Sequence, residues 1–271
     1  MLPAAKAIPK EMLPVLDRPV IQYVVQEAAD AGLDDVLLIV SRGKHALEEH
    51  FASSPELEQR LRASGKDSVL TSIDQLRKKT KVHSVRQPEQ RGLGDAVLQA
   101  REHVGNEPFV CLLGDTIFSG HPPARQLIEA YRQFGTSVIG LEEVAPEKVS
   151  RYGIVGGEPV SEGAFRLNTL VEKPTVEQAP SRFAIAARYV LTPTIFDCIA
   201  QTRTGTGGEI QLTDAMKLLL AREPIHGVVL RGRRHDVGNP IDWLKTNLLF
   251  AARDPQVWDA IAPLLRELVS P

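Results

Sequence analysis

An acidic side chain follows each of two apolar runs of the chain. Asp115 ends the run FVCLLG, which begins at Phe109, and Asp236 comes shortly after the run HGVVL at 226–230. In open α/β sheets ligands bind beyond the carboxyl ends of the strands, and magnesium takes one or two carboxylates plus substrate phosphates. Either aspartate could therefore hold a metal ion. An aspartate that caps a turn or a helix is also common, and Thr116 replaces the second acid of a doubled-acid motif.

Two lysines lie where they could neutralise phosphate. Lys10 lies in a proline-punctuated segment, and proline holds a loop in one shape. A lysine on such a loop can act as a point charge for phosphate. Lys173 follows Glu172 at the end of a strand-like run. From the residues alone, Lys10 could equally be a solvated side chain, and the Glu172–Lys173 pair a surface ion pair that adds little stability.

Two glycine-containing segments could bring backbone close to a ligand. Gln87 ends a strand-like run, and Gly92-Leu-Gly94 opens a helix whose N-terminus attracts anions. The spacing misses the dinucleotide-binding fingerprint, so turn glycines and a surface glutamine are the alternative. In the second segment, Gly205, Gly207 and Gly208 precede Glu209 and a Thr213-Asp214 pair. That segment is typical of a mobile loop followed by a helix N-cap.

Composition excludes several classes of protein. The 271 residues carry 32 Lys+Arg and 34 Asp+Glu, a net charge of -2, so the broad basic surface of a nucleic-acid-binding protein is absent. Cys111 and Cys198 stand singly, which argues against a disulfide framework or a zinc site. The aliphatic run 36–40 is too short to cross a membrane, and prolines interrupt the position of a signal peptide. We expect a cytoplasmic enzyme without a membrane partner.

The elements that must position these residues alternate between strand and helix in the first half of the chain. Hydrophobic spacing predicts helices at 19–31, 46–63, 93–101 and 123–134, and strands at 36–40, 82–86, 109–113 and 137–143. Residues 64–81 are polar and are predicted to be a surface excursion. Strands separated by helices favour a three-layer, mostly parallel sheet.

The pattern changes from about residue 150. Three strand-like runs, at 152–160, 165–174 and 183–191, are joined by short turns and predict an antiparallel element laid against the first sheet. Helices are predicted at 193–201, 213–222, from 240 and from 256, with a strand at 225–230. The sequence shows neither a linker nor an internal repeat. We expect a single domain over 1–271, with a mainly nucleotide-binding part (1–149), a mainly sugar-binding part (150–239) and C-terminal helices (240–271).

The segment KAIPKEMLPVLDRPVIQYVV, residues 6–25, resembles the bacterial UTP–glucose-1-phosphate uridylyltransferases, which belong to the sugar-1-phosphate nucleotidyltransferases. The resemblance continues through nearly the whole chain. It implies a Rossmann-like three-layer mixed sheet of the nucleotide-diphospho-sugar transferase type, with a small antiparallel sugar-binding element. It also implies that UTP and α-D-glucose 1-phosphate give UDP-glucose and pyrophosphate, that Mg²⁺ is the cofactor, and that the protein is a homo-oligomer.

The resemblance also implies a role for each candidate residue. Gln87 and Gly92 would read the pyrimidine base, an amide being able to donate and accept. Asp115 and Asp236 would hold the metal. Catalysis would then be positioning and charge neutralisation, with the residues named as catalytic being Lys10, Asp115 and Lys173. The sugar phosphate would contact Lys173, and the sugar would contact Gly153, Glu172 and Glu209.

In the family, a strand and a Gly-x-Gly-Thr-Arg turn precede the region that matches Met1, and this turn binds the triphosphate. Without that central strand we expect unpaired edges inside the sheet. Two explanations are weighed: residues upstream of Met1 belong to the product, which we favour, or the chain is a non-catalytic paralogue that associates with an active enzyme and modulates it. The same chemistry with dTTP or another sugar 1-phosphate is a further alternative. A glycosyltransferase is weaker, because Asp-x-Asp is absent at Asp115.

Overall fold

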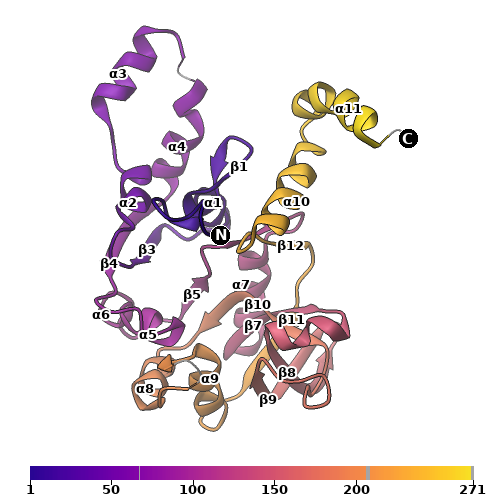
Figure 1. Cartoon of the computed structure of the whole chain (residues 1–271). Coiled ribbons are helices and arrows are strands. Elements are labelled where there is room, and N and C mark those ends of the chain that lie inside the picture. The colour runs from indigo at the N-terminus through magenta and orange to yellow at the C-terminus, as the bar shows by residue number, and fades with distance from the viewer. Residues whose placement is uncertain (67, 206–207, 270–271) are drawn as a thin grey trace.

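The protein was analysed as a computed structural model that describes residues 1–66, 68–205 and 208–269. Figure 1 shows two regions, one built from the first hundred residues around β3 and β4, and one built around a larger sheet. The C-terminal helices α10 (Pro240–Ala251) and α11 (Pro255–Val269) extend away from the larger sheet. Among the described residues, no helix is long and apolar enough to cross a membrane.

The larger sheet has six strands in the order β5-β10-β7-β11-β9-β8. Only β7 and β11 pair in parallel within it. The mixed sheet is therefore confirmed, whereas the expectation of a mostly parallel sheet is wrong. The bounds are β5 (Phe109–Leu112), β7 (Ser137–Glu143), β8 (Gly153–Ser161), β9 (Ala164–Glu172), β10 (Phe183–Leu191) and β11 (Ile225–Val229).

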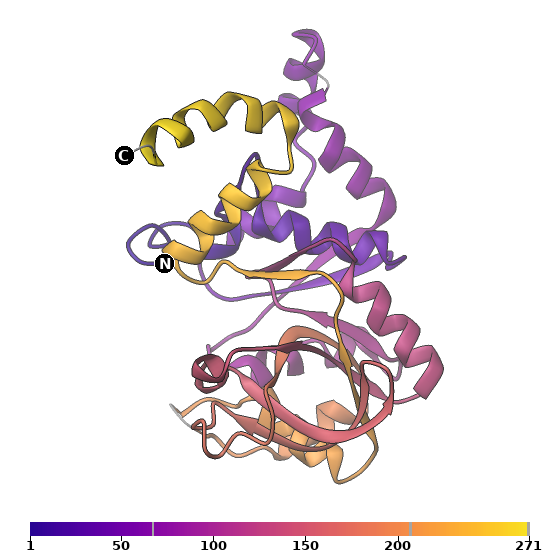
Figure 2. The same ribbon diagram turned by 90° about the vertical axis from the view of Figure 1, so that its right-hand side faces the viewer.

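The strands after residue 150 do not form a separate element. Phe183 and Ala184 of β10 pair with both β7 and β8, so β10, β7, β11, β9 and β8 close into a ring, which Figure 2 shows in its lower half. The predicted antiparallel layer is thus continuous with the main sheet. The correction has a simple cause: short turns dictate antiparallel neighbours, but they do not reveal which distant strand completes the sheet.

Two further pairs of strands position the site. The first, β3 (Asp35–Val40) and β4 (Lys81–Arg86), is parallel. The second, β6 (Thr116–Ser119) and β12 (Arg233–Asp236), is antiparallel and places Asp236 opposite Thr116. A short β1 (Pro14–Val15) and β2 (Arg18–Pro19) ribbon follows the turn η1 (Lys10–Met12).

A cavity of about 740 Å³ separates β3 from β5, and both strands line it together with α1 (Val20–Asp30). Among the described residues, β3 pairs only with β4, and β5 pairs only with β10. The expected unpaired strand edges inside the sheet are therefore confirmed. One end of this cavity contains Glu11, Lys44 and Asp115.

Helices cover the strands with apolar faces. Val20, Val24 and Val25 of α1 are buried in one core cluster with Leu38 and Val40 of β3, and the helix ends before Gly32, whose φ is +87°. A second core lies between the larger sheet and the helices α5 (Leu93–Leu98), α8 (Thr194–Gln201) and α9 (Leu212–Leu220). The helix α7 (Pro123–Phe134) packs on β7 and β10.

Two predictions about the region 46–81 are wrong. The single helix 46–63 is two helices, α2 (His45–Phe51) and α3 (Pro55–Ala63), because proline disfavours helical backbone in the residue before it. The surface excursion contains α4 (Ser68–Lys79), and its Leu76 is buried in the core cluster with α1; Asp67 lies outside the described residues. Likewise, the helix 93–101 divides into α5 and α6 (Arg101–Val104).

His235 makes the stability of this fold depend on pH. Its ring is buried, lies edge-on to Phe250 of α10 and hydrogen bonds to Ser119. Burial, with Arg233 and Arg253 nearby, lowers the pKa of His235 to about 4. The unfolded chain therefore binds this proton more tightly, so the contribution of His235 to stability is complete above its ordinary pKa and is lost as the pH falls toward 4.

We expect the free energy of unfolding to fall by about 3 kcal/mol through this group between its ordinary pKa and pH 4. Urea titrations across that range should show a smaller fall for His235→Gln than for the unaltered chain. The exposed His121 provides the control His121→Gln, which should retain the full pH dependence. Equal pH dependence in all three proteins would contradict this role of His235.

Candidate active site

Lys10, Asp115 and Asp236 are brought together from three distant segments. The Nζ atom of Lys10 donates to Oδ2 of Asp115, which follows β5. The amide of Val237 donates to the carbonyl of Asp115 at 3.1 Å, and β12 pairs with β6 beside it. The turn after β5 and the end of β12 are thereby joined, and each supplies one carboxylate.

The charges in this cluster depend on one another. Burial disfavours the charged form of Lys10, but Asp115, Glu11 and Asp236 together outweigh burial and raise the pKa of Lys10. Lys10 is therefore a permanent cation at neutral pH. Beside it, Lys44 donates to Oε1 of Glu11 at 2.7 Å, whereas Oε2 of Glu11 is buried without a hydrogen-bond partner.

The donor set at Asp115 and Asp236 suits magnesium rather than zinc. Among the described residues, no group of three or more His, Cys, Asp or Glu side chains could hold a metal by itself. Magnesium takes one or two carboxylates and completes its shell with water and substrate phosphates. Two carboxylates on joined strand ends, one of them already paired with a cation, fit that demand.

Gln87 and Gly92 form the second predicted cluster, and the structure brings them together. The buried Gln87 carboxamide donates to the Gly92 carbonyl at 3.3 Å and to Oδ2 of Asp95 at 2.8 Å. Arg91 donates to the other oxygen of Asp95 at 2.8 Å. Both amide hydrogens of Gln87 are thus engaged, and Asp95, which sequence reasoning missed, fixes the orientation of this carboxamide.

A backbone pair joins this cluster to the segment that contains Glu209. Ile210 donates to the carbonyl of Arg91 at 2.7 Å and accepts from the amide of Gly94 at 2.8 Å. Gly92 has φ +103°, and a Cβ there would lie 2.7 Å from the Ile210 carbonyl oxygen. Glu209 therefore lies beside the predicted base-reading residues, and its sugar contact stays a prediction. Gly207, from the same loop, lies outside the described residues.

The third cluster contains Gly153, Glu172 and Thr213. Thr213 donates to Oε2 of Glu172 at 2.7 Å, and a Cβ at Gly153 would lie 3.2 Å from both of those oxygens. The expectation that Thr213 opens a helix as its cap is wrong, because α9 begins at Leu212 with Gln211 as its N-cap. Thr213 is instead a buried partner of Glu172, a role that spacing alone does not reveal.

Lys173 lies in a strained conformation next to this cluster. Its φ is +46°, in the left-handed region that side chains other than glycine seldom adopt. Its amide donates to the carbonyl of Tyr152 at 3.1 Å, and Nζ lies 3.6 Å from Oε1 of Glu172. Strain of this kind concentrates at ligand-binding sites. The lysine side chain is 60% exposed and thus accessible to an anion.

The strand β12 connects the acidic cluster to the Glu172 cluster. Arg234, two residues before Asp236, has a side chain that is only 8% exposed and donates to Glu142 at 2.6 Å. Its guanidinium carbon lies 4.4 Å from the centroid of the Tyr152 ring, just before Gly153. The three clusters therefore belong to one connected framework of β12, β9 and the 209–213 segment.

Comparisons with known proteins agree with this fold. The nucleotidyl transferase family matches residues 1–253. The chain is 43% identical to "UTP--glucose-1-phosphate uridylyltransferase YngB" of Bacillus subtilis over 99% of its length and 91% of that protein. A UTP-bound UGPase from Acinetobacter baumannii superposes with a TM-score of 0.90 at 34% identity, over 98% of this chain and 94% of that one. UDP-glucose pyrophosphorylase complexed with UDP-glucose gives 0.86 at 36% identity, over 94% of each chain.

Fold and site together define an α/β protein of the class that handles nucleotides. The matches cover nearly the whole chain at well above the identity at which a family is shared. The chain belongs to the nucleotidyl transferase family.

The close approach at Gly92 is testable by adding one methyl group. Gly92→Ala should lower the free energy of unfolding by about 3 kcal/mol, because it combines left-handed backbone with a clash against the Ile210 carbonyl. Gly32 is a matched control, since its φ is +87° and nothing lies within 4 Å of a Cβ there. Gly32→Ala should cost about 1 kcal/mol. Equal losses in urea denaturation would show that the contact with Ile210 is unimportant.

Proposed function

We propose that the protein transfers a uridylyl group from UTP to α-D-glucose 1-phosphate and releases pyrophosphate. The observation that carries the proposal is the joining of Asp115, Asp236 and Lys10 at adjacent strand ends. The relatives support the substrates, since one is named a UTP–glucose-1-phosphate uridylyltransferase and others are described with UTP or UDP-glucose bound.

The reaction needs no covalent intermediate on the protein. A phosphate oxygen of glucose 1-phosphate attacks the α-phosphorus of UTP, a new P–O bond forms, and the bond to the leaving pyrophosphate breaks. Lys10 supplies positive charge near the triphosphate, and the exposed Lys173 supplies it near the sugar phosphate. Magnesium, held by Asp115 and Asp236, would neutralise nucleotide phosphates.

Base recognition would fall to Gln87. Since Gly92 and Asp95 engage its amide hydrogens, its oxygen is the atom that can accept the N3–H of uracil. Thymine presents the same edge and adds one methyl group, which a pocket discriminates by only about 1–3 kcal/mol. The preference for UTP over dTTP and for glucose over other sugars is therefore part of the proposal.

Pyrophosphate release from UTP and glucose 1-phosphate tests the proposal directly. With Mg²⁺ present, Asp115→Ala should reduce turnover at least 100-fold, because the loss of preorganised charge at a phosphoryl centre costs about 2.7 kcal/mol or more. Asp197→Asn is the control, since Asp197 lies on the surface and pairs with Arg101 at 2.7 Å. Full magnesium-dependent turnover by Asp115→Ala would contradict the proposal, and dTTP serves as the competing substrate.

The cavity between β3 and β5 bears on the activity of the 271-residue chain. A strand placed there would find an unpaired edge on either side. We expect a form extended ahead of Met1 by a strand and a Gly-x-Gly-Thr-Arg turn to turn over at least 100-fold faster than the chain without them. Equal rates would show that the turn is dispensable. If both forms fold and neither turns over, the non-catalytic paralogue is the better account.

The homo-oligomeric state and the cytoplasmic location stay predictions. The apolar side chains of Ile241, Leu244 and Leu248 are 66%, 55% and 41% exposed on α10. Their spacing places them on one face of the helix. This face supports the proposal that the C-terminal helices form a contact between subunits.

A further inference from the structure

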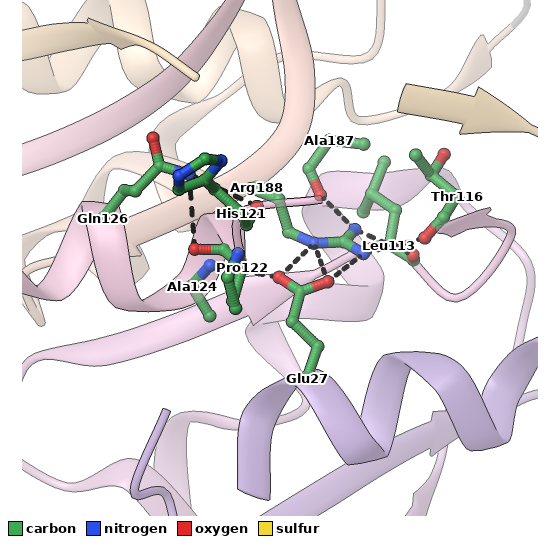
Figure 3. A network of polar contacts seen from close by, with 9 residues as sticks. All are labelled: Glu27, Leu113, Thr116, His121, Pro122, Ala124, Gln126, Ala187 and Arg188. Atoms are coloured by element: carbon green, nitrogen blue, oxygen red, sulfur yellow. Dashed lines mark hydrogen bonds and ion pairs between the residues drawn. The ribbon is translucent and has the colours of Figure 1, made fainter. Parts of the chain in front are cut away.

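A buried ion pair lies directly behind the turn that carries Asp115. Figure 3 shows the guanidinium of Arg188 facing the carboxylate of Glu27, with backbone carbonyls around them. Arg188 is fully buried, and Glu27 is 9% exposed. The Nε atom of Arg188 lies 3.0 Å from Oε1 of Glu27, and Nη2 lies 2.8 Å from Oε2, which is a bidentate geometry.

The same guanidinium binds the backbone on both sides of Asp115. Nη1 donates to the carbonyl of Leu113 at 3.3 Å, and Nη2 donates to the carbonyl of Thr116 at 2.8 Å. These carbonyls are the two ends of the turn Leu113–Thr116, which contains Gly114 and Asp115. Because one rigid planar group contacts both ends, the separation between the ends is fixed.

The strand that carries Arg188 is bent toward this turn. Ala187 has φ +59°, which alanine seldom adopts, and the register of β10 against β7 shifts between Ile185 and Tyr189. The carbonyl of Ala187 accepts from the amide of Leu113 at 3.2 Å and from Nη1 of Arg188 at 3.0 Å. The bulge in β10 thus brings one backbone oxygen and one guanidinium to the same turn.

We infer that Arg188, oriented by Glu27, is a positioning residue that sets the place of the Asp115 carboxylate. Arg188 binds the turn from the buried side, whereas Lys10 binds its carboxylate from the other. Glu27 connects the same pair to α7, since its Oε1 accepts from the amide of Ala124 at 3.1 Å. The catalytic consequence rests on the proposed function, but the position of the turn does not.

The test compares Arg188→Lys and Glu27→Gln with a matched control. Lysine keeps the charge of Arg188 but cannot contact Glu27, Leu113 and Thr116 with one planar group. Arg77 offers the control, because it binds the carboxylates of Glu58 and Asp74 and the carbonyls of Phe51 and Ala52, far along the chain from Asp115. Arg77→Lys removes the same kind of contact without touching the turn.

Crystal structures of the three variants and kinetics of pyrophosphate release are then measured together. We expect Arg188→Lys to shift the Asp115 carboxylate by about 1 Å and to lower kcat about 10- to 100-fold, with a smaller change in the KM for glucose 1-phosphate. Glu27→Gln should change both in the same direction and provides the reading if Arg188→Lys fails to fold. Arg77→Lys should lower Tm and leave the turn and kcat unchanged.

An unmoved turn in both Arg188→Lys and Glu27→Gln would overturn the inference. A moved turn with unchanged kcat would overturn its catalytic consequence. If the unaltered protein releases no pyrophosphate, the proposed function fails, and the crystallographic comparison still decides whether Arg188 positions the turn.

Discussion

A guanidinium with no contact to water constrains how the two regions of this molecule meet. Arg188 lies inside the sheet, and leaving such a charge unpaired would cost several kcal/mol. Glu27 therefore has to approach from α1, and carbonyls on both sides of Gly114 and Asp115 have to face inward. The arrangement of α1, β5, β6 and β10 around this charge determines where the Asp115 carboxylate can be, and the pairing of β6 with β12 then brings Asp236 to its side.

The nucleotide-binding and sugar-binding parts are coupled by backbone rather than by a linker. The 209–213 segment touches both, since Ile210 bonds to Arg91 and Gly94 while Thr213 bonds to Glu172. Gly92 permits this close approach because it has no Cβ. A shift on one side is thus transmitted directly to the other, which suits a reaction in which two phosphates must be held within bonding distance.

Much of the site could be predicted from local sequence. Asp115 and Asp236 follow apolar runs, and Gln87 and Gly92 are five residues apart, so short-range pattern was enough to single them out. Asp95 and Thr213 were missed because each acts through a side chain that is distant or concealed by helix-cap chemistry. Arg188 was missed for a related reason: inside the run FAIAARYVL it has the sequence context of a strand residue, and nothing local indicates a left-handed Ala187. Strand direction was also mispredicted, since hydrophobic periodicity does not encode which strands pair.

The central claim is that Asp115 and Asp236 together hold a divalent cation beside Lys10. Anomalous diffraction from crystals soaked with Mn²⁺ and UDP-glucose measures this directly, because manganese takes the same oxygen ligands as magnesium. The account predicts a manganese peak within about 2.5 Å of a carboxylate oxygen of both aspartates, and its loss in Asp236→Asn crystals. A peak that avoids Asp115 while Lys10 stays paired with it would contradict the account.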